Sequence, residues 1–309
     1  MTHRLSIIIP TYNRSSILPR AVASALLASP ENSEIIVVDD QSDTAECALR
    51  SLADDPRLKI ITNEGDKGAA GARNFGVSIA QGEVIIFLDD DDEIMPDYPA
   101  RVLAASDQSK ADFGFSAVML VGHGMDVADR TTLKSWKALQ QGIIPANVPL
   151  KHKMPGIGYG FWVRKTVFQD VGGLCEKQTV DEDGDLFCRL YGLEHACWFE
   201  TVPGFRIHTA SETNGQDAPR LSTGTHPAIE AKCRIRTYQK NHRYFSLRSA
   251  DRWFLISRIL RHAARKGADD LAIAFIKEIE PIDWRVQGWV FWKLKKLPTR
   301  RYRSYREPR

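Results

Sequence analysis

Cysteine is scarce in this chain and is not arranged in pairs. The 309 residues include five cysteines, an odd number, and no two of them form a CxxC pair. A disulfide framework needs paired cysteines, and a zinc knuckle needs closely spaced ones. The pattern argues against both kinds of site, and we expect a reducing, cytosolic setting.

Long apolar runs are also missing. The amino-terminal apolar stretch Leu5–Ile9 ends at Pro10 and is far too short for a signal peptide. Nothing approaches the roughly 20 apolar residues that cross a bilayer. We therefore expect that the chain does not span a membrane by itself.

Two common nucleotide-binding motifs are absent. There is no GxxxxGK[ST] loop, which weakens the hypothesis of a metal-dependent nucleotidyl or phosphoryl transferase. Gly65, Gly68 and Gly71 do not have the GxGxxG spacing, which disfavours a dinucleotide-dependent dehydrogenase. The glycines instead indicate a loop before a helix, where Arg73 can offer a forked cationic contact to phosphate or ribose. A surface arginine after a turn is the alternative.

What is present is an ordinary globular composition, 43% hydrophobic and 26% charged, with a net charge of +3. Short segments rich in Ile and Val alternate with stretches of helical periodicity, which is typical of βαβ units and a parallel sheet. The predicted strands are Leu5–Ile9, Glu34–Val38, Leu58–Ile61 and Val84–Leu88, and the predicted helices are Ile17–Leu27, Thr44–Leu52 and about Gly71–Ala80.

The second half of the chain is less regular. From Phe113 to Pro155 the sequence predicts a strand and a long connection of the kind that shapes a binding cleft. The segment Gly156–Arg164 looks extended, and Thr209–Pro227 looks like a loop. The predicted helices of this half are Asp183–Tyr191, Ile229–Asn241, Asp251–Arg265 and Asp269–Ile279.

Four consecutive aspartates, Asp89 to Asp92, directly follow the strand Val84–Leu88. Such crowding raises the pKa of each carboxyl unless a cation neutralises the group. The carboxyl end of a strand is also where open α/β sheets place their ligands. The cluster therefore predicts a site for Mg²⁺, Mn²⁺ or Ca²⁺. A solvated acidic turn is the alternative.

The order of motifs resembles the inverting family 2 glycosyltransferases of the GT-A fold, over about Leu5 to His208. The resemblance implies an α/β fold, in which a Rossmann-like nucleotide-binding sheet is flanked by helices and followed by a helical extension. It rests on five segments in order: SIIIPTYNR (6–14), EIIVVDDQS (34–42), GAAGARNFG (68–76), GEVIIFLDDDDEIMP (82–96) and DEDGDLFCRL (181–190).

The resemblance also implies roles for the acidic cluster. Asp91 is similar to the direct metal ligand of a DxD element, and Asp89 would hold ribose or a metal-bound water. Asp90 stands where a small polar residue is usual, so the division of roles within the cluster is open. Mn²⁺ or Mg²⁺ would neutralise the charge that builds on a diphosphate leaving group.

For the nucleotide base, the resemblance favours Asp40, whose carboxylate can accept the imide N–H of uracil. Pro10, Thr11 and Tyr12 would line the same pocket. Asp39 beside it is the structural alternative, and capping of the next helix by Asp40 or Ser42 is another.

Asp183 matches the residue that serves as general base in the family. A carboxylate there can take the proton of an attacking acceptor hydroxyl, and single displacement inverts the anomeric carbon. The alternative is that Asp181, Glu182 and Asp185 are carboxylates favoured at a helix start. His208 would complete the metal site or touch the diphosphate, although a structural histidine is equally open. Trp162 could stack on an acceptor sugar or lie in the core.

The C-terminal segment from Trp284 is basic and aromatic, with nine Lys or Arg residues and one acid, Glu307. Such a segment can lie in the headgroups of an anionic membrane, which would suit an enzyme of lipid-linked or cell-envelope glycans. A helix packed through Trp289 and Trp292, with a solvated tail, is the alternative. We expect no nucleic-acid partner, because no recognised binding module accompanies the charge.

Together these features predict a metal-dependent inverting glycosyltransferase that moves a sugar from a nucleotide-diphosphate donor, a UDP-sugar by preference, to a glycan or lipid-linked acceptor. A non-catalytic sugar-binding module is the non-enzymatic alternative. The predicted parts are 1–112 for the nucleotide sugar, 113–215 for the acceptor and 216–309 as a helical C-terminal region. The predicted location is the cytoplasm, with peripheral attachment to the inner face of the membrane left open.

Overall fold

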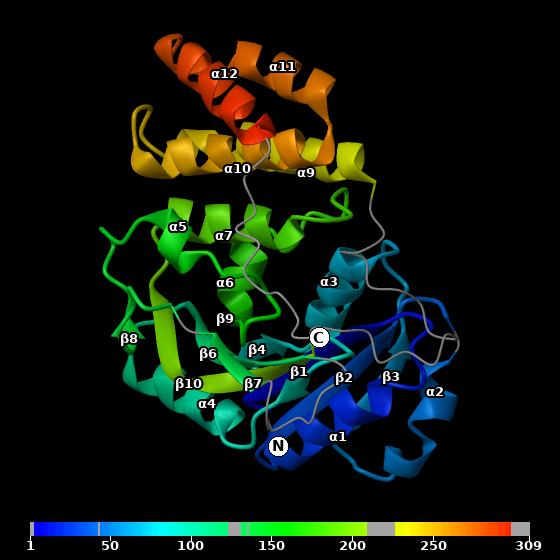
Figure 1. The fold of residues 1–309 in the computed structure, drawn as a ribbon. Helices are drawn as coiled ribbons and strands as arrows, with labels where there is room; N and C mark the ends of the chain where they lie inside the picture. Colours follow the sequence, from blue (N-terminus) through cyan, green and yellow to red (C-terminus); the bar gives the residue numbers. More distant parts are fainter. Residues whose placement is uncertain (1–2, 43, 123–130, 135, 209–225, 298–309) are drawn as a thin grey trace, which may run out of the picture. The chain divides into compact units, whose positions relative to one another are not determined.

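The computed structural model describes residues 3–42, 44–122, 131–134, 136–208 and 226–297 (Figure 1). The chain divides into two compact units, residues 1–225 and 226–309. The predicted boundaries at 112 and 215 remain predictions, and the predicted loop Thr209–Pro227 lies mostly outside the described residues.

Unit 1 contains one mixed sheet with the strand order β3-β2-β1-β4-β9-β6-β10-β5, while β7 pairs with β6 and β8 pairs with β10. The strands are β1 (Leu5–Thr11), β2 (Ser33–Asp39), β3 (Leu58–Thr62), β4 (Val84–Phe87), β5 (Glu93–Ile94), β6 (Phe113–Val121), β7 (Thr131–Lys134), β8 (Gly142–Ile143), β9 (Trp162–Arg164) and β10 (Cys197–His208).

The four strands predicted in the first half are confirmed, and they are mutually parallel. In β1 and β2 the register pairs Thr11 with Asp39, so both strands end at the same level. The neighbouring strand β4 ends just before Asp89 on the other side of β1. The parallel register therefore brings Thr11, Asp40 and the acidic cluster to one edge of the sheet.

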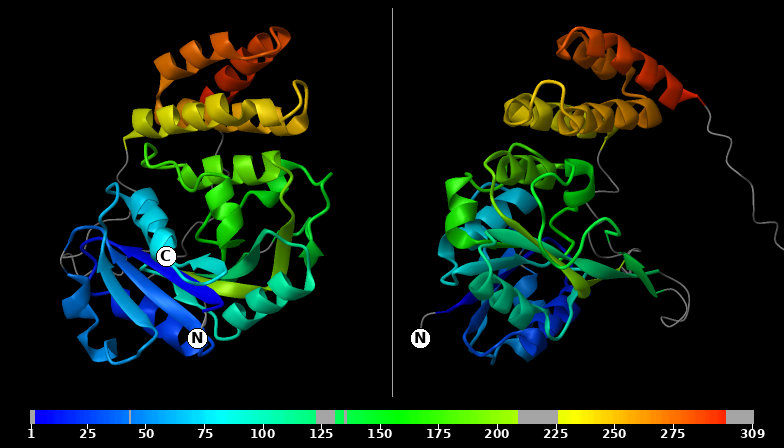
Figure 2. Two further views of the ribbon diagram at one scale, coloured as in Figure 1. Left: turned by 180° about the vertical axis from the view of Figure 1, so that it is seen from behind. Right: turned by 90° about the vertical axis from the view of Figure 1, so that its left-hand side faces the viewer.

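Helices cover both faces of this sheet, as Figure 1 and the two further views in Figure 2 show. The helical elements of unit 1 are α1 (Leu18–Ala28), α2 (Ala45–Ala48), the 3₁₀ turn η1 (Arg50–Leu52), α3 (Ala69–Ile79), α4 (Tyr98–Gln108), α5 (Leu150–Lys153), α6 (Lys165–Asp170) and α7 (Glu182–Gly192).

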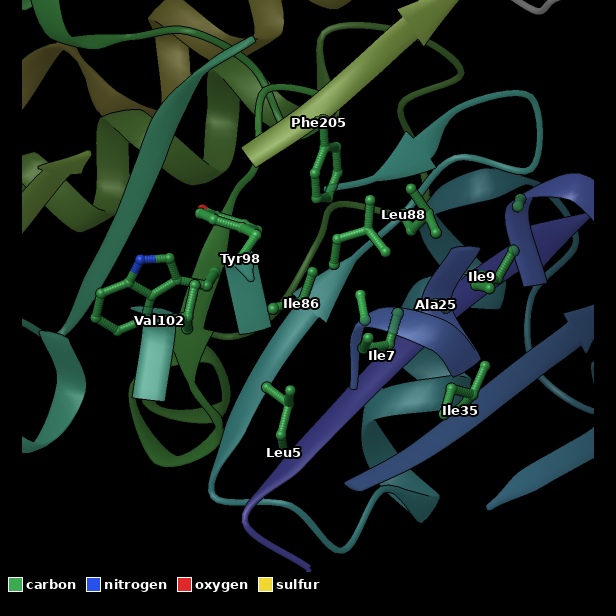
Figure 3. Close-up of a cluster of buried hydrophobic side chains, with 14 of the residues drawn as sticks. Leu5, Ile7, Ile9, Ala25, Ile35, Ile86, Leu88, Tyr98, Val102 and Phe205 are labelled. Carbon is green, nitrogen blue, oxygen red and sulfur yellow. The ribbon is translucent and has the colours of Figure 1, made fainter. Parts of the chain in front are cut away.

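Alternate residues of the strands enter two separate cores, because successive strand side chains point to opposite faces. Leu5, Ile7 and Ile9 pack with α1 and α4, as Figure 3 shows from the labelled residues of this cluster. Ile8 packs on the other face with α3, α6 and α7. Burial on both faces explains why these strands are continuous apolar runs and not alternating ones.

Two predicted elements differ from the structure. The predicted helix Thr44–Leu52 is broken into α2 and η1. The segment Gly156–Arg164, predicted as extended, is mostly turn, and only Trp162–Arg164 forms a strand. Trp162 lies in the core with 1% of its surface exposed, so its predicted stacking on an acceptor sugar is wrong and the core alternative holds.

Unit 2 is helical within the part of the chain that is described. Its elements are α9 (Pro227–Asn241), the 3₁₀ turn η2 (His242–Tyr244), α10 (Ala250–Lys266), α11 (Asp269–Glu278) and α12 (Asp283–Lys296). Helix α10 contacts the other three helices and begins at a serine cap, where Ser249 Oγ accepts from the Arg252 N–H. Among the described residues, no helix is long and apolar enough to cross a bilayer.

Candidate functional site

The acidic cluster forms a tight turn after β4. The Asp92 N–H donates to the Asp89 carbonyl at 3.1 Å, which folds the four aspartates back on themselves. Thr11, at the end of β1, donates from Oγ1 to Asp90 at 2.8 Å. The ends of two neighbouring strands are thus joined by a buried hydrogen bond.

Arg14 lies between two of the aspartates. Its Nη1 is 2.7 Å from Asp90 Oδ1 and 3.1 Å from Asp91 Oδ2. Arg20 also donates to the Asp91 carbonyl at 2.9 Å. Burial raises the pKa of Asp90 to about 6, although the Arg14 charge opposes the rise. Arginine therefore supplies part of the positive charge that this crowded cluster requires.

Arg73 joins the acidic cluster to α7. It projects from α3, its side chain is buried, and its Nη2 lies 2.6 Å from Asp89 Oδ1. Its Nη1 lies 3.3 Å from Glu182 Oε1. Burial disfavours the charge of Arg73, but the carboxylates of Asp89 and Glu182 outweigh it and raise its pKa. The surface alternative for Arg73 is therefore wrong.

The proposed base lies at the start of α7. Asp181 precedes this helix in the left-handed region, with a φ of 63°, and turns the chain so that Glu182 and Asp183 open the helix. Asp183 Oδ1 accepts from the Gly184 N–H at 2.6 Å. Burial, followed by the charge of Asp183, raises the pKa of Glu182 to about 7.

A glycine-rich turn between α5 and β9 passes close to the carboxylates of Asp183 and Asp89. A Cβ on Gly156 would lie 2.9 Å from Asp183 Oδ2, and a Cβ on Gly158 would lie 3.1 Å from Asp89 Oδ2. Tyr159 follows, and its ring carbons approach the same point beside Gly156. Glycine is favoured at position 156 because its φ is 124° and a Cβ there would press on Asp183.

Tyr159 belongs to an aromatic group beside Asp183. Lys134 Nζ lies 3.7 Å from the centre of the Tyr159 ring. Trp136 meets the same ring edge-on, with ring centres 5.5 Å apart. The site therefore has an aromatic and cationic wall close to the predicted base.

The two aspartates after β2 have different environments. Asp39 anchors the following loop, because its carboxylate accepts from the backbone N–H groups of Ser42, Thr44 and Ala45. Asp40 is not the helix cap. Its carboxylate accepts from Asn63 Nδ2 at 2.7 Å and from the Gly68 N–H at 2.8 Å.

The other predicted base-pocket residues lie at the end of β1. Pro10 is half-buried, Thr11 is buried and Tyr12 is 40% exposed. Lys67 Nζ lies 4.6 Å from the centre of the Tyr12 ring, which places the loop before α3 beside this tyrosine. The loop of residues 63–68 therefore contacts both residues, Asp40 through Asn63 and Gly68 and Tyr12 through Lys67.

His208 ends β10 on the other side of the acidic turn. Its backbone N–H donates to Asp92 Oδ1 at 3.0 Å, and its Nε2 lies 3.2 Å from Glu93 Oε2. The contact with His208, with Arg206 beside it, lowers the pKa of Glu93 to about 2. The metal role of His208 remains a prediction. To coordinate a metal, the imidazole ring would have to bind it while also contacting Glu93.

A divalent cation fits the chemistry of the aspartates only in part. In the described ranges, no three His, Cys, Asp or Glu side chains are arranged to hold a metal ion. Mg²⁺, however, is commonly bound by one or two carboxylates together with substrate phosphates. Asp91 and Asp89 meet that requirement, since each presents a carboxylate at the turn.

Sequence reasoning missed three contributors. Arg14 was part of the SIIIPTYNR segment but had no assigned contact. Glu182 was weighed as a helix-start carboxylate or as one of three acids that could orient the acceptor, and not as a partner of Arg73. Tyr159 was in a segment predicted as extended. The only signal for Tyr159 was its position between three glycines, Gly156, Gly158 and Gly160, which is typical of a turn and not of a strand.

Comparisons with known proteins show which family the chain resembles. The model of a family described as glycosyl transferase family 2 matches residues 6–172. An uncharacterized glycosyltransferase of Haemophilus influenzae is 30% identical over 189 residues, which are 60% of this chain and 61% of that protein. A GalNAc(5)-diNAcBac-PP-undecaprenol beta-1,3-glucosyltransferase of Campylobacter jejuni is 41% identical over 95 residues, which are 30% of this chain and 31% of that protein.

Among solved structures, S. aureus TarS 1-349 in complex with UDP-GlcNAc is similar in fold. The TM-score is 0.70 at 16% identity, and the match covers 95% of this chain and 88% of that chain. The fold prediction is therefore confirmed. This chain spans less than two thirds of the length of either of the two relatives compared by sequence.

Proposed function

The chain belongs to glycosyl transferase family 2, and from this premise we propose that it is a metal-dependent, inverting glycosyltransferase. It moves a sugar from a nucleotide-diphosphate donor, a UDP-sugar by preference, to a hydroxyl of a glycan or lipid-linked acceptor. The match of residues 6–172 to the family covers the ends of β1, β2 and β4, where the donor would bind.

The bridge made by Arg73 carries this proposal. One guanidinium contacts Asp89, at the donor end of β4, and Glu182, at the start of α7. Arg73 therefore holds the predicted donor side and the predicted base side at a fixed separation. An arginine buried between two carboxylates is also suited to meet a diphosphate, because its planar fork matches phosphate oxygens.

The nucleotide would lie along the ends of β1 and β2. Asp40 is held by Asn63 and Gly68, so its carboxylate is oriented before any ligand arrives. Each oxygen keeps a further lone pair that can accept the imide N–H of uracil. Tyr12, which is partly exposed, offers a ring beside it. The solved neighbour with UDP-GlcNAc supports a UDP-sugar as the donor class.

Mn²⁺ or Mg²⁺ would be held by Asp91 and Asp89 together with the donor diphosphate. When bound, the ion acts as a Lewis acid that stabilises charge on the leaving phosphate. Asp91 is paired with Arg14, whose side chain would have to share Asp91 with the ion or turn toward the diphosphate. Asp90, buried and bonded to Thr11, holds the turn in place.

Asp183 would remove the proton from the acceptor hydroxyl. Because Gly156 has no side chain, none lies between the Gly156 backbone and Asp183 Oδ2, and we propose that the acceptor hydroxyl approaches Asp183 on this side. Tyr159 and Trp136 would form the wall against which the acceptor sugar packs. Attack from this side, opposite the diphosphate, inverts the anomeric carbon.

The acceptor would be a glycan carried on a lipid. The name of the Campylobacter jejuni relative supports a glycan carried on an undecaprenol diphosphate. An acceptor of that kind belongs to cell-envelope polysaccharide synthesis and requires peripheral contact with a membrane. The basic and aromatic C-terminal segment suits such contact, and its last residues, 298–309, lie outside the described part of the chain.

Substitution of the predicted base tests this function. Asp183→Asn should lower kcat by about 10²–10⁴-fold, because general base catalysis contributes that much. Donor binding should be kept, since the predicted pocket for the nucleotide base is formed by Asp40 and the end of β1 and not by Asp183. Asp91→Ala should instead abolish the Mn²⁺-dependent rise in melting temperature with UDP-sugar. Asp170→Asn, which changes an exposed acid at the end of α6, serves as the control.

Transfer would be measured with a panel of isotope-labelled UDP-sugars, and NMR of the product would identify the anomer. Normal turnover by Asp183→Asn would contradict the assignment of the base. A retained anomeric configuration would contradict inversion. Wild-type protein that neither binds nor turns over any nucleotide sugar would contradict the function as a whole.

A further inference from the structure

Helix α12 has an exposed apolar face. Its inner face contacts α10 and α11 through Gly288 and Trp292, both of which are buried. Six apolar residues on and beside the helix are between 45% and 71% exposed. We call this set the outer face of α12, and it consists of Ile282, Val286, Trp289, Val290, Leu294 and Leu297.

These residues form one continuous stripe. At 100° per residue, the six positions occupy a sector of about 140°, which also contains Lys293 and Asp283, and Gly288 and Trp292 lie outside it. Helices on the surface of a globular protein normally show the reverse, with polar residues outward. Contiguous exposed apolar surface of this kind marks an interaction site.

The charges around the stripe indicate what it meets. Lys293 lies within the outer face, with Nζ 5.2 Å from the centre of the Trp289 ring and 5.0 Å from that of Trp292. Lys296 lies at the edge of the stripe and is ion-paired with Asp269, whereas Lys295 lies on the opposite side of the helix, over the Phe291 ring. The acid of the helix, Asp283, is paired with Arg248 at 2.7 Å. The stripe therefore has one lysine within it and one at its edge, and the sequence adds Arg300, Arg301, Arg303, Arg306 and Arg309 after it.

An anionic lipid surface complements this combination. Apolar side chains with an interfacial tryptophan and bordering lysines are typical of helices that lie in the headgroup region. The 14 residues of α12 measure about 21 Å, which is too short to cross the hydrocarbon core. A second copy of the chain fits less well, because a two-fold contact through this face would bring two sets of lysines together.

We propose that the outer face of α12 is a membrane-docking surface, which inserts its apolar side chains at the interface of an anionic bilayer while its lysines contact the headgroups. The proposal rests on the proposed function in that a lipid-linked acceptor would lie in such a bilayer. It goes further because it assigns the contact to one face of one helix and to named side chains.

Flotation of the full-length protein with vesicles tests this surface. We expect the wild type to bind vesicles rich in phosphatidylglycerol and to bind phosphatidylcholine vesicles weakly. Leu294→Glu and Trp289→Glu should each weaken the partition by about tenfold, the loss expected for one interfacial apolar side chain. Lys293→Gln should weaken binding to the anionic vesicles by about fivefold and leave the phosphatidylcholine value unchanged.

Leu27→Glu is the matched control, because Leu27 is 86% exposed on α1 of unit 1 and the substitution is identical. It should leave partition unchanged. Circular dichroism melting would show that each variant is folded. Equal partition of Leu294→Glu and the wild type would overturn the proposal. So would a wild-type dimer that Leu294→Glu converts to a monomer without any change in vesicle binding.

The outcome is separable from that of the proposed function. If both hold, Leu294→Glu keeps UDP-sugar hydrolysis and transfer to a short soluble acceptor but loses transfer to a lipid-linked acceptor in vesicles. If the wild type floats in a Leu294-dependent way but uses no nucleotide sugar, the docking surface stands and the function fails. If the wild type uses UDP-sugars but does not float with vesicles, the proposed function stands and the docking surface fails.

Discussion

Glu182 carries the clearest electrostatic signature of the site. Its carboxyl is buried and lies beside the charge of Asp183, and these two effects outweigh the attraction of Arg73. The result is a pKa of about 7 in the folded chain, compared with 4.5 for an ordinary glutamate. A carboxyl with such a pKa changes its proton occupancy near neutral pH, which is common at functional sites.

This shift predicts a pH dependence of stability. The folded chain holds the Glu182 proton more tightly than the unfolded chain, so the stabilisation is complete below about pH 4.5 and is lost as pH rises through about 7. Glu182→Gln cannot ionise, so its melting temperature should fall less across this range than that of the wild type. Parallel melting curves at every pH would contradict the raised pKa.

Arg73 predicts a large loss of stability when its charge is removed. Arg73→Met keeps an unbranched side chain but leaves Asp89 and Glu182 without their shared partner. Because the Asp89 side chain is 34% exposed, we expect a loss of about 1–3 kcal/mol, below the roughly 3–5 kcal/mol of a fully buried pair, and a lower urea midpoint. Arg248→Met removes an exposed partner of Asp283 and should leave the midpoint unchanged. A small effect at Arg73 would indicate that water reaches its carboxylates.

At the scale of elements, the junction between β3 and α3 decides how Asp40 is presented. Asn63 donates to Asp40 and also to the Asp66 carbonyl, and Gly68 donates to Asp40 just before α3 begins. The loop 63–68 is therefore folded around the carboxylate. Gly71 in α3 allows this, because a Cβ there would lie 1.7 Å from the Asp66 oxygen.

Gly71→Ala should displace this loop. Because the obstacle is a backbone carbonyl, the chain must move, and overpacking of this kind costs about 1–3 kcal/mol. We also expect weaker UDP binding, since Gly68 would shift away from Asp40. Urea unfolding and calorimetric titration with UDP measure the two effects. Ser78→Ala, on the exposed side of the same helix, should change stability by no more than about 0.5 kcal/mol.

At the scale of the whole molecule, the chain has two compact units, and the contacts described for the candidate site all lie in unit 1. Unit 2 has its own core, in which Phe275 meets Tyr238 edge-on with ring centres 5.2 Å apart. Each unit buries its own apolar side chains, so their stabilities can change separately.

Phe275→Ala should lower the stability of unit 2 without changing donor binding by unit 1. The cavity should destabilise unit 2 by about 3–5 kcal/mol, while the affinity of the chain for UDP-sugar stays at the wild-type value. Ile256→Val, a milder change in the same core, should cost about 0.5–1.5 kcal/mol and serves if Phe275→Ala unfolds unit 2. Calorimetric unfolding and donor titration measure both quantities. A weaker donor affinity in Ile256→Val would contradict the independence of donor binding from the stability of unit 2.

The parallel half of the sheet could be predicted because its signals are local. Apolar runs such as Leu5–Ile9 and Val84–Leu88 reveal buried strands, and the residues that follow them must lie at the carboxyl edge of the sheet. This is why Asp40 and the acidic cluster could be assigned to one site. Short elements were harder, since Trp162–Arg164 has too few residues to show a periodicity.

By itself, the sequence determined the order of strands and helices in the first half, the family, and the position of carboxylates at strand ends, because each depends on neighbours in the chain. Only the tertiary structure decided which charges meet. Arg73 and Glu182 are 109 residues apart, and Arg14 and Asp90 are 76 apart. Their contacts arise from packing α3 and α7 on the same face of the sheet and from the parallel pairing of β1 with β4, which no local pattern specifies.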